Sequence, residues 1–301
     1  MTTGLRDELR TLTTEAVDAS LSDIDTISTL DAARRMNALD RSVPLAVEPC
    51  LPAIARAADL IADAFARGGR LVYVGAGTPG RLGVLDASEC PPTFGTDPSQ
   101  VVGVIAGGPV ALTTAVEGAE DDEDAAVRDL DALGLTSDDV VVGISASGRT
   151  PYVVAAVREA RRRSATTVAV ACNADSAAGR EADVAIDVVV GPEFIAGSTR
   201  LKAGTAQKLV LNMLTTLAMV RSNKTFGNRM VDVRATNDKL VARAFSLVQD
   251  ITGAADADVS AALSESDGEV KTAVAMILTG SSAEDARTRL SDAGGSLRAV
   301  I

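Results

Sequence analysis

Short runs of valine and isoleucine alternate with helical segments through the middle of this 301-residue chain. The runs typical of strands are Leu71–Val74, Val101–Ile105, Val140–Ile144, Thr167–Val170 and Val184–Val190. The segments with helical spacing around them are Leu51–Ala66, Asp122–Leu133, Pro151–Arg163 and Arg200–Val220. Strands that are apolar throughout are typical of a parallel sheet with helices on both faces. The pattern predicts an α/β fold with a doubly wound sheet, whose binding site lies at the carboxyl ends of the strands.

The rest of the chain predicts smaller helical parts around this sheet. The expected parts are a helical arm at 1–55, the sheet domain at 56–222, a connecting helix within 223–250 and a compact helical unit at 251–301. Helical spacing in the arm covers Leu5–Ala16 and Thr29–Leu39. A turn is expected at Gly227-Asn228. The helices of the last unit are predicted at Val259–Leu263, Val270–Leu278 and Ala283–Leu290.

Composition excludes several classes of function. A net charge of −12 argues against a basic face for nucleic acid. The chain has no histidine, which excludes Ser-His-Asp catalysis and histidine metal sites. Cys50, Cys90 and Cys172 are few and far apart, as expected in a reducing cytoplasm. No apolar run approaches the length of a membrane span, and the N-terminus lacks the apolar core of a signal peptide.

A glycine-dense turn follows the first predicted strand. Gly75, Gly77 and Gly80 match the G-x-G-x-x-G fingerprint of dinucleotide-binding proteins. Two features disfavour that interpretation: Pro91-Pro92 is expected to cut the next helix short, and Ala106-Gly107-Gly108 follows the second strand in place of a ribose-binding acid. A tight turn without a ligand is a further alternative. We favour a phosphate cradle, since a glycine turn and a helix N-terminus together bind anions.

A serine-rich turn follows the third strand in the same way. Ser145, Ser147 and Thr150 surround the flexible Gly148, and Pro151 suits the first position of a helix. The hydroxyls and the helix N–H groups predict a second phosphate cradle, with Thr150 as the N-cap. The alternative is an ordinary capping loop without a ligand.

A third loop, 191–202, precedes the longest apolar helix and carries Arg200 and Lys202 as counter-charges in an acidic chain. These cations make the loop a candidate for binding an anionic ligand. The alternative is that the loop binds no ligand and that Ser198 or Thr199 only caps the helix.

Two acidic residues stand out as candidate proton-transfer groups. Glu89 is expected at the C-terminal end of a short helix, where the helix dipole disfavours an acid. Glu120 opens the acidic run 120–124, and acids in a first helical turn are also common for stability alone. Two carboxyls in different surroundings can act as general acid and general base.

Long motifs in the chain resemble the N-acetylmuramic acid 6-phosphate etherase family. The matching segments are VGAGTPGRLGVLDASECPPTFG (74–95), VEGAEDD (116–122), GISASGRTPYV (143–153), GSTRLKAGTAQKLVLNMLTT (197–216) and GNRMVDVRATNDKL (227–240). The resemblance implies a sugar-isomerase (SIS) fold with a five-stranded parallel sheet, a homodimer, and a C-terminal unit similar to ubiquitin-associated domains. Pro79 departs from the family's usual serine, and Leu201 from its usual methionine.

The resemblance also implies an activity. The family cleaves the D-lactyl ether of N-acetylmuramic acid 6-phosphate to N-acetylglucosamine 6-phosphate and D-lactate in cell-wall sugar recycling, without metal or cofactor. Glu89 would protonate the departing lactate oxygen, and Glu120 would be the base at C2. The residues expected to bind substrate are Gly77, Thr78, Arg81, Ser145, Ser147, Gly148, Arg149, Thr150, Glu193, Ser198 and Lys202. The rival hypotheses are a phosphosugar isomerase and a non-catalytic phosphosugar-sensing regulator on the same fold.

Overall fold

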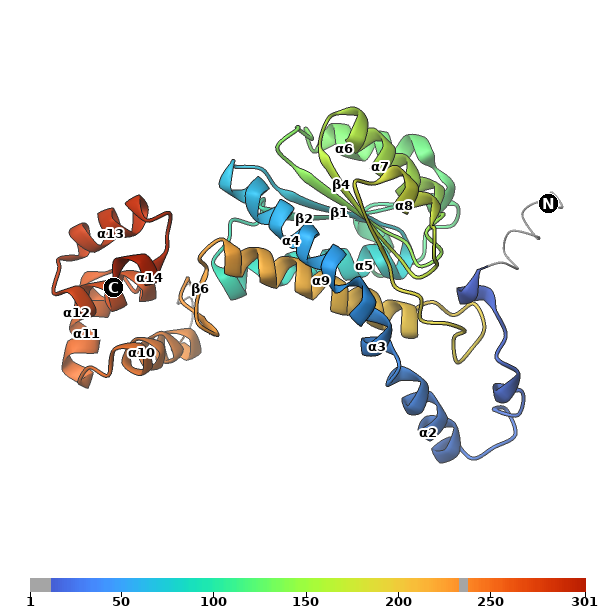
Figure 1. The fold of residues 1–301 in the computed structure, drawn as a ribbon, viewed down its shortest axis with the longest axis horizontal. Helices are drawn as coiled ribbons and strands as arrows, with labels where there is room; N and C mark the ends of the chain where they lie inside the picture. The colour runs from blue at the N-terminus through green and yellow to red at the C-terminus, as the bar shows by residue number, and fades with distance from the viewer. Residues whose placement is uncertain (1–11, 233–237) are drawn as a thin grey trace. The chain divides into compact units, whose positions relative to one another are not determined.

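The computed structural model describes residues 12–232 and 238–301. These form two compact units (Figure 1). The first contains the chain up to Ser88 together with Ser99–Thr215, and the second contains Glu89–Pro98 and Thr216–Ile301. Within the described ranges, no helix is both long enough and apolar enough to cross a bilayer.

The first unit is organised around a five-stranded parallel sheet in the order β2-β1-β3-β4-β5. Its strands are β1 (Leu71–Gly75), β2 (Val101–Ile105), β3 (Val140–Ile144), β4 (Thr166–Ala171) and β5 (Val184–Asp187). The predicted parallel sheet is confirmed. The last strand is shorter than predicted, because β4 ends at Ala171, which pairs with Asp187.

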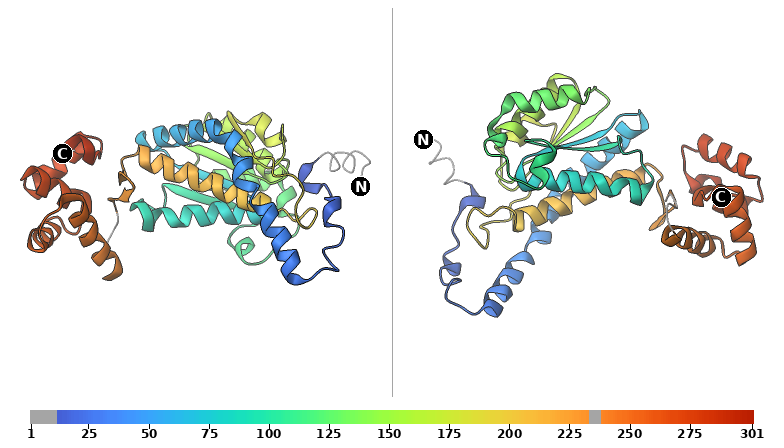
Figure 2. Two further views of the ribbon diagram at one scale, coloured as in Figure 1. Left: turned by 60° about the horizontal axis from the view of Figure 1, so that its bottom comes forward. Right: turned by 180° about the vertical axis from the view of Figure 1, so that it is seen from behind.

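Helices cover both faces of the sheet (Figures 1 and 2). They are α4 (Leu51–Ala66), α5 (Gly77–Phe94), α6 (Glu123–Ala132), α7 (Pro151–Arg162), α8 (Ala177–Glu181) and α9 (Lys202–Arg221). On one face, Val72 and Val74 pack in a core with Leu130 of α6 and Tyr152 of α7. On the other face, the buried Tyr73 hydroxyl donates to Asp86 of α5 at 2.9 Å. Because both faces are buried, the strands are apolar at nearly every position, with Thr166, Thr167 and Asp187 as the polar exceptions.

Helix α5 differs from its prediction. It continues through Pro91 and Pro92 to Phe94, and Gly95 N donates to the Pro91 carbonyl at 3.0 Å beyond the prolines. Proline removes a backbone donor, but its fixed φ is compatible with a helical path. Glu89 therefore lies within a long helix and not at the end of a short one. The argument against a dinucleotide site from a short helix is therefore wrong. The other argument, that no ribose-binding acid follows β2, still holds.

The N-terminal arm begins with the 3₁₀ turns η1 (Thr13–Glu15) and η2 (Ala19–Leu21). It continues through α2 (Thr29–Asp40), α3 (Val43–Val47) and η3 (Glu48–Cys50). The helix predicted at Thr29–Leu39 is confirmed. Of the helix predicted at Leu5–Ala16, residues 5–11 lie outside the described ranges, and the described end is only the turn η1. Helix α2 has no buried side chain.

The second unit has its own apolar core. A short hairpin, β6 (Thr225–Phe226) and β7 (Arg229–Met230), confirms the predicted turn. The helices are α10 (Asp238–Thr252), α11 (Asp256–Glu265), α12 (Val270–Thr279), α13 (Ala283–Asp292) and α14 (Leu297–Val300). The three predicted helices are present as α11, α12 and α13. Ala244 and Val248 of α10 are buried in the same core as α12.

Candidate active site

A cleft of about 460 Å³ opens at the carboxyl ends of β1 and β3. The chain runs from β1 to β2 at one edge of the sheet and then crosses to β3, which lies on the other side of β1. Ligands of open α/β sheets bind at such a switch point. The cleft is lined by Glu15, Ala76, Gly77, Thr78, Pro79, Glu120, Asp121, Ala146, Ser147, Arg149, Thr150, Pro151 and Thr199.

The glycine turn after β1 forms one wall of the cleft. A Cβ at Gly75 would lie 2.6 Å from the Gly80 nitrogen, so strand and helix can approach closely only without a side chain there. Gly77 has φ +57°, the left-handed region that favours glycine. Gly77 and Thr78, both predicted, line the cleft at the first turn of α5. Backbone N–H groups of this turn are available to an anion.

The serine turn after β3 forms another part of the cleft wall. The Ser145 hydroxyl is almost fully buried, accepts from the Gly148 N–H at 3.0 Å and lies 2.8 Å from the Thr150 hydroxyl. Ser145 therefore organises the turn, while Ser147, Arg149 and Thr150 line the cleft. Only glycine fits at 148, where φ is +71° and a Cβ would lie 2.4 Å from Ser176 Cβ.

Thr150 and Pro151 occupy the predicted positions at the start of α7. Thr150 is the N-cap residue, but its side chain makes no capping hydrogen bond, because its hydroxyl pairs with Ser145. Pro151 is the first residue of the helix, as predicted.

The third loop is held by a buried acid. The Glu193 carboxylate accepts from the backbone N–H groups of Lys202 at 2.8 Å and Ala203 at 2.9 Å, and so caps α9. The Lys202 ammonium donates to the Val190 carbonyl at 2.7 Å, and both side chains are buried. Neither residue lines the cleft, and neither does Ser198. Thr199 lines it instead.

The two predicted proton-transfer carboxyls belong to different elements, and only one of them lines the cleft. Glu120, in the turn η5 (Ala119–Asp121), is exposed and lines the cleft. It also lines a neighbouring hollow of about 200 Å³ that contains Arg81, whose Nε donates to the Leu112 carbonyl at 3.0 Å. Glu89 is exposed and does not line the cleft. It lies on α5 well beyond Gly77, about 18 Å along the helix at 1.5 Å per residue.

Three polar cleft residues were not predicted from the sequence: Glu15, Asp121 and Thr199. Asp121 is one acid in an acidic run, and Thr199 was considered only as a helix cap. Glu15 lies far from the other cleft residues in sequence, and no local pattern distinguishes it.

Cysteine chemistry finds no support at this cleft. Burial, followed by the negative charges of Glu193 and Asp187, raises the pKa of the nearby Cys172 thiol to about 12, so it is not a thiolate nucleophile. Among the described residues, no group of three or more cysteine, aspartate or glutamate side chains is arranged to hold a metal ion.

Known proteins share both the fold and the sequence. Residues 53–161 match the N-terminal SIS domain of glucokinase regulatory protein, and residues 118–217 match the SIS domain. A proposed phosphosugar isomerase involved in capsule formation from Bacteroides fragilis has a similar structure, with a TM-score of 0.52 and 20% identity. The similarity covers 66% of this chain and 94% of that one, and it concerns the fold alone.

Several relatives match almost the whole chain. The N-acetylmuramic acid 6-phosphate etherase of Streptomyces avermitilis is 60% identical over 99% of this chain and 96% of the relative. The protein of the same name in Mycolicibacterium smegmatis is 52% identical over 98% of this chain and 99% of its own length. Because this identity extends over the arm, the sheet and the C-terminal helices, the chain belongs to the N-acetylmuramic acid 6-phosphate etherase family.

Proposed function

We propose that this protein cleaves the D-lactyl ether of N-acetylmuramic acid 6-phosphate, giving N-acetylglucosamine 6-phosphate and D-lactate in the cytoplasm. The observation that carries the proposal is the 52% to 60% identity to relatives of that name over nearly the full chain. The cleft supports it, since a glycine-rich turn, a serine-rich turn and Glu120 all line it. Such a site suits a phosphosugar, and no cofactor enters the mechanism.

The phosphate binds between the two turns. Ser147, Thr150 and the N–H groups at the starts of α5 and α7 surround it, and Arg149 supplies positive charge. Ser145 and Gly148 shape the serine turn, and Ser198 belongs to the third loop. Glu193 and Lys202 act from inside that loop by fixing the start of α9. A fixed phosphate orients the sugar, and orientation is a large part of catalysis.

The chemistry is elimination followed by addition. Ring opening gives an aldehyde at C1, which makes the C2 proton acidic. Glu120 takes that proton, the C–H electrons form a C2=C3 double bond, and the bond from C3 to the lactyl oxygen breaks. Glu89 gives its proton to that oxygen, so lactate leaves as the alcohol. Water then adds to C3 and a proton returns to C2, which completes the sugar product.

A second copy of the chain brings Glu89 to the reaction. Glu89 lies outside the cleft on an exposed stretch of α5 that includes Leu85, which is 51% exposed. Helix α2 has no buried side chain, and Leu30 and Leu45 of the arm are 60% and 68% exposed. An arm whose helix α2 buries no side chain within its own chain, and which leaves leucines exposed, is typical of a subunit interface. The homodimer is therefore part of this proposal.

The test is an assay of D-lactate released from N-acetylmuramic acid 6-phosphate. We expect the wild type to release it and, in D₂O, to leave deuterium at C2 of the product. Glu120→Gln and Glu89→Gln should each lose about 10²-fold or more in turnover, as for general acid–base groups. The control is Glu123→Gln, an exposed carboxylate near Glu120 that does not line the cleft, and it should be unchanged.

Other outcomes would contradict the proposal. Conversion of a phosphosugar without lactate would identify an isomerase, and binding without turnover would identify a sensor. A product without deuterium at C2 would exclude elimination and addition.

A further inference from the structure

The described N-terminal segment Thr13–Glu15 is fastened to the loop that follows β4. The side-chain oxygen of Asn173 accepts from the Thr13 backbone N–H at 2.7 Å and from the Thr13 hydroxyl at 2.9 Å. The Asn173 amide nitrogen donates to the Thr14 hydroxyl at 3.0 Å. Thr14 is fully buried and Asn173 is nearly so. One amide side chain therefore holds two consecutive residues of a segment about 160 positions away.

The same amide also holds the serine turn. The Asn173 nitrogen donates to the Ala146 carbonyl at 3.1 Å, and Ala146 lines the cleft beside Ser147. The amide is thus shared between a wall of the cleft and the N-terminal segment. Its hydrogen bonds fix the position of that segment relative to the phosphate-binding turn.

The residue that follows this anchor lines the cleft. Glu15 is exposed and lines the cleft, which places a third carboxylate there beside Glu120 and Asp121. The third loop passes close to it, since a Cβ at Gly197 would lie 3.2 Å from Glu15 Oε2. Gly197 has φ +75°. Glu15 is thus a part of the cleft lining that the N-terminal arm contributes, and Thr13 and Thr14 hold it from behind.

We propose that Glu15 binds substrate by accepting hydrogen bonds from hydroxyl or amide N–H groups of the sugar, and that Asn173 is its positioning residue. The proposal rests on the proposed function, because it assumes a phosphosugar in this cleft. An ionised carboxylate is only an acceptor, so it pairs with the neutral donors of a sugar body and repels the phosphate. The phosphate therefore stays at the serine and glycine turns, and the sugar orients toward the arm.

The experiment measures binding and turnover in the full-length protein. The probe for binding is N-acetylglucosamine 6-phosphate, by calorimetry, and lactate release gives kcat and KM. Losing a hydrogen bond to a charged acceptor should weaken binding about 10-fold or more. We expect Glu15→Ala to raise Kd and KM together by that factor with kcat nearly unchanged, the signature of a lost ground-state contact. Glu15→Gln keeps an acceptor oxygen without the charge, so its Kd and KM should lie between those of the wild type and Glu15→Ala.

Matched variants separate positioning from folding. Asn173→Ala should reproduce the rise in KM, and adding Glu15→Ala to it should weaken binding little further, since both act through one contact. If Asn173→Ala fails to fold, Thr14→Val and Thr14→Ser replace it, because only the serine keeps the hydroxyl that Asn173 uses. Asp25→Asn, an exposed acid of the same arm outside the cleft, is the control and should match the wild type.

The outcomes distinguish this inference from the proposed function. Unchanged Kd and KM in Glu15→Ala, with lactate still released, would overturn the inference and leave the function standing. If the wild type binds the sugar phosphate without releasing lactate, and Glu15→Ala loses that binding, the proposed function is overturned and the inference stands. A wild type with no affinity for the sugar phosphate would overturn both.

Discussion

Pro79 lies in the first turn of α5 and lines the cleft. Proline fits this part of a helix, but it has no N–H to offer an anion. We expect Pro79→Ser to add a backbone donor and a hydroxyl, and so to tighten binding of N-acetylglucosamine 6-phosphate about 2- to 10-fold. Calorimetry measures the change. The control is Pro98→Ser at an exposed position before β2, and equal or weaker binding in Pro79→Ser would contradict the expectation.

Local spacing revealed some site residues and could not reveal others. Ser147 and Thr150 were predictable, because a strand, a serine-rich turn and a proline at the helix start already specify a turn that faces a ligand. Glu193 was predicted as a substrate contact, and local spacing gave no sign that its carboxylate caps a helix that starts nine residues later. Glu15 was out of reach, because its place depends on the contact of Thr13 and Thr14 with Asn173.

At the scale of elements, the alternation of apolar runs was enough to predict the parallel sheet and its covering helices. It was not enough for α5, where proline propensity predicted an end at Cys90 and the helix runs on to Phe94. Packing of Tyr73 against this helix, with its hydroxyl on Asp86, illustrates the tertiary contacts that outweigh local preference. Glu89 therefore lies within a continuous helix whose first turn carries Gly77 and Thr78.

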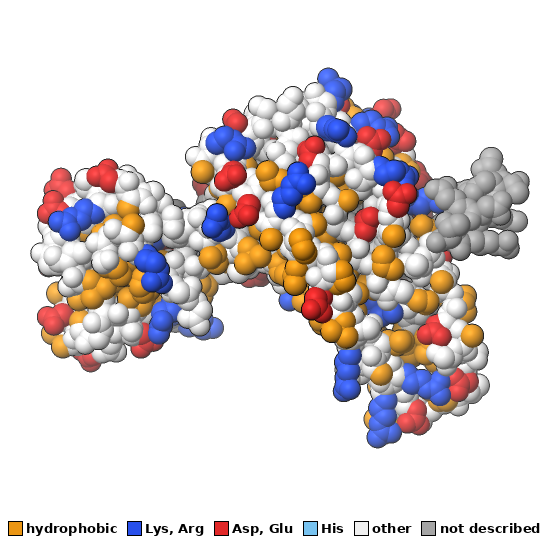
Figure 3. Space-filling model, in the orientation of Figure 1, with side chains coloured by type: hydrophobic (Ala, Val, Ile, Leu, Met, Phe, Trp, Pro, Cys, Tyr) orange, Lys and Arg blue, Asp and Glu red, His pale blue; other side chains and the backbone are white. Residues whose placement is uncertain are grey.

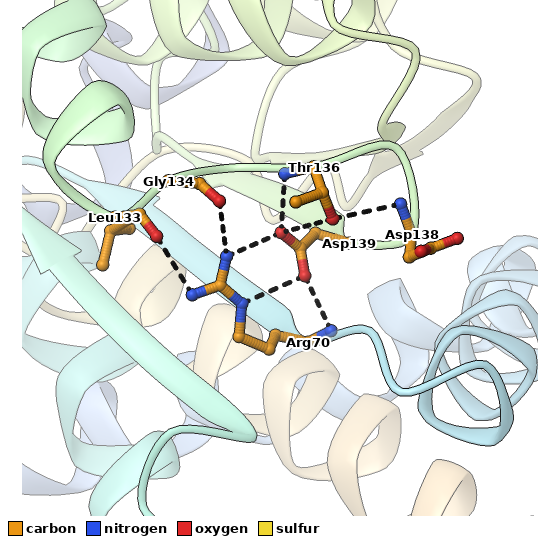
Figure 4. A network of polar contacts seen from close by, with 6 residues as sticks. All are labelled: Arg70, Leu133, Gly134, Thr136, Asp138 and Asp139. Atoms are coloured by element: carbon orange, nitrogen blue, oxygen red, sulfur yellow. Dashed lines mark hydrogen bonds and ion pairs between the residues drawn. The ribbon is translucent and has the colours of Figure 1, made fainter.

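Arg70 and Asp139 join the amino ends of β1 and β3 (Figure 4). One Asp139 oxygen accepts from Arg70 Nη2 at 2.8 Å and from the Thr136 N–H at 2.9 Å. The other accepts from the Arg70 backbone N–H at 2.9 Å. Burial alone raises the pKa of the Asp139 carboxyl, but the hydrogen bonds from Arg70 and Thr136 outweigh it and lower the pKa below its ordinary value.

This ion pair predicts a pH-dependent loss of stability. A carboxyl with a lower pKa in the folded state stabilises the protein above its unfolded pKa, near pH 4, and loses that contribution as the pH falls through the folded pKa. We expect Asp139→Asn to lower the free energy of unfolding by about 2–3 kcal/mol at pH 7. Urea titrations from pH 7 to pH 3 should show the difference from wild type shrinking below about pH 4.

The neighbouring Asp138 is the control for this prediction. Its side chain is 57% exposed and lies 3.7 Å from Arg67, so Asp138→Asn should change stability by less than about 1 kcal/mol. A difference between Asp139→Asn and wild type that does not vary with pH would contradict the assignment.

At the scale of the whole molecule, the surface charge suits a small anionic substrate better than a polymer. Asp and Glu number 41 against 29 Lys and Arg. On the face shown in Figure 3, blue and red side chains are interspersed. Negative charge of this size repels nucleic acid, whereas a local set of N–H groups and hydroxyls can still bind one phosphate.

The proposed dimer predicts that each active site combines Glu120 of one copy with Glu89 of the other. Mixed dimers of Glu89→Gln and Glu120→Gln would then contain one site with both glutamates and one with neither. Random pairing makes half of the dimers mixed, so we expect about a quarter of wild-type lactate release. Co-expression of the two variants with different affinity tags, followed by tandem purification, isolates the mixed dimer for the assay, which should then reach about half.

The arm provides the control for this complementation. Leu45→Asp places a charge on its exposed apolar surface and should prevent both association, measured by sedimentation, and recovery of activity. Val241→Asp charges a comparably exposed apolar residue of α10 and should prevent neither. Both carboxylates act within one chain if the mixed dimer is no more active than the parent variants, because neither of its copies then contains an intact pair.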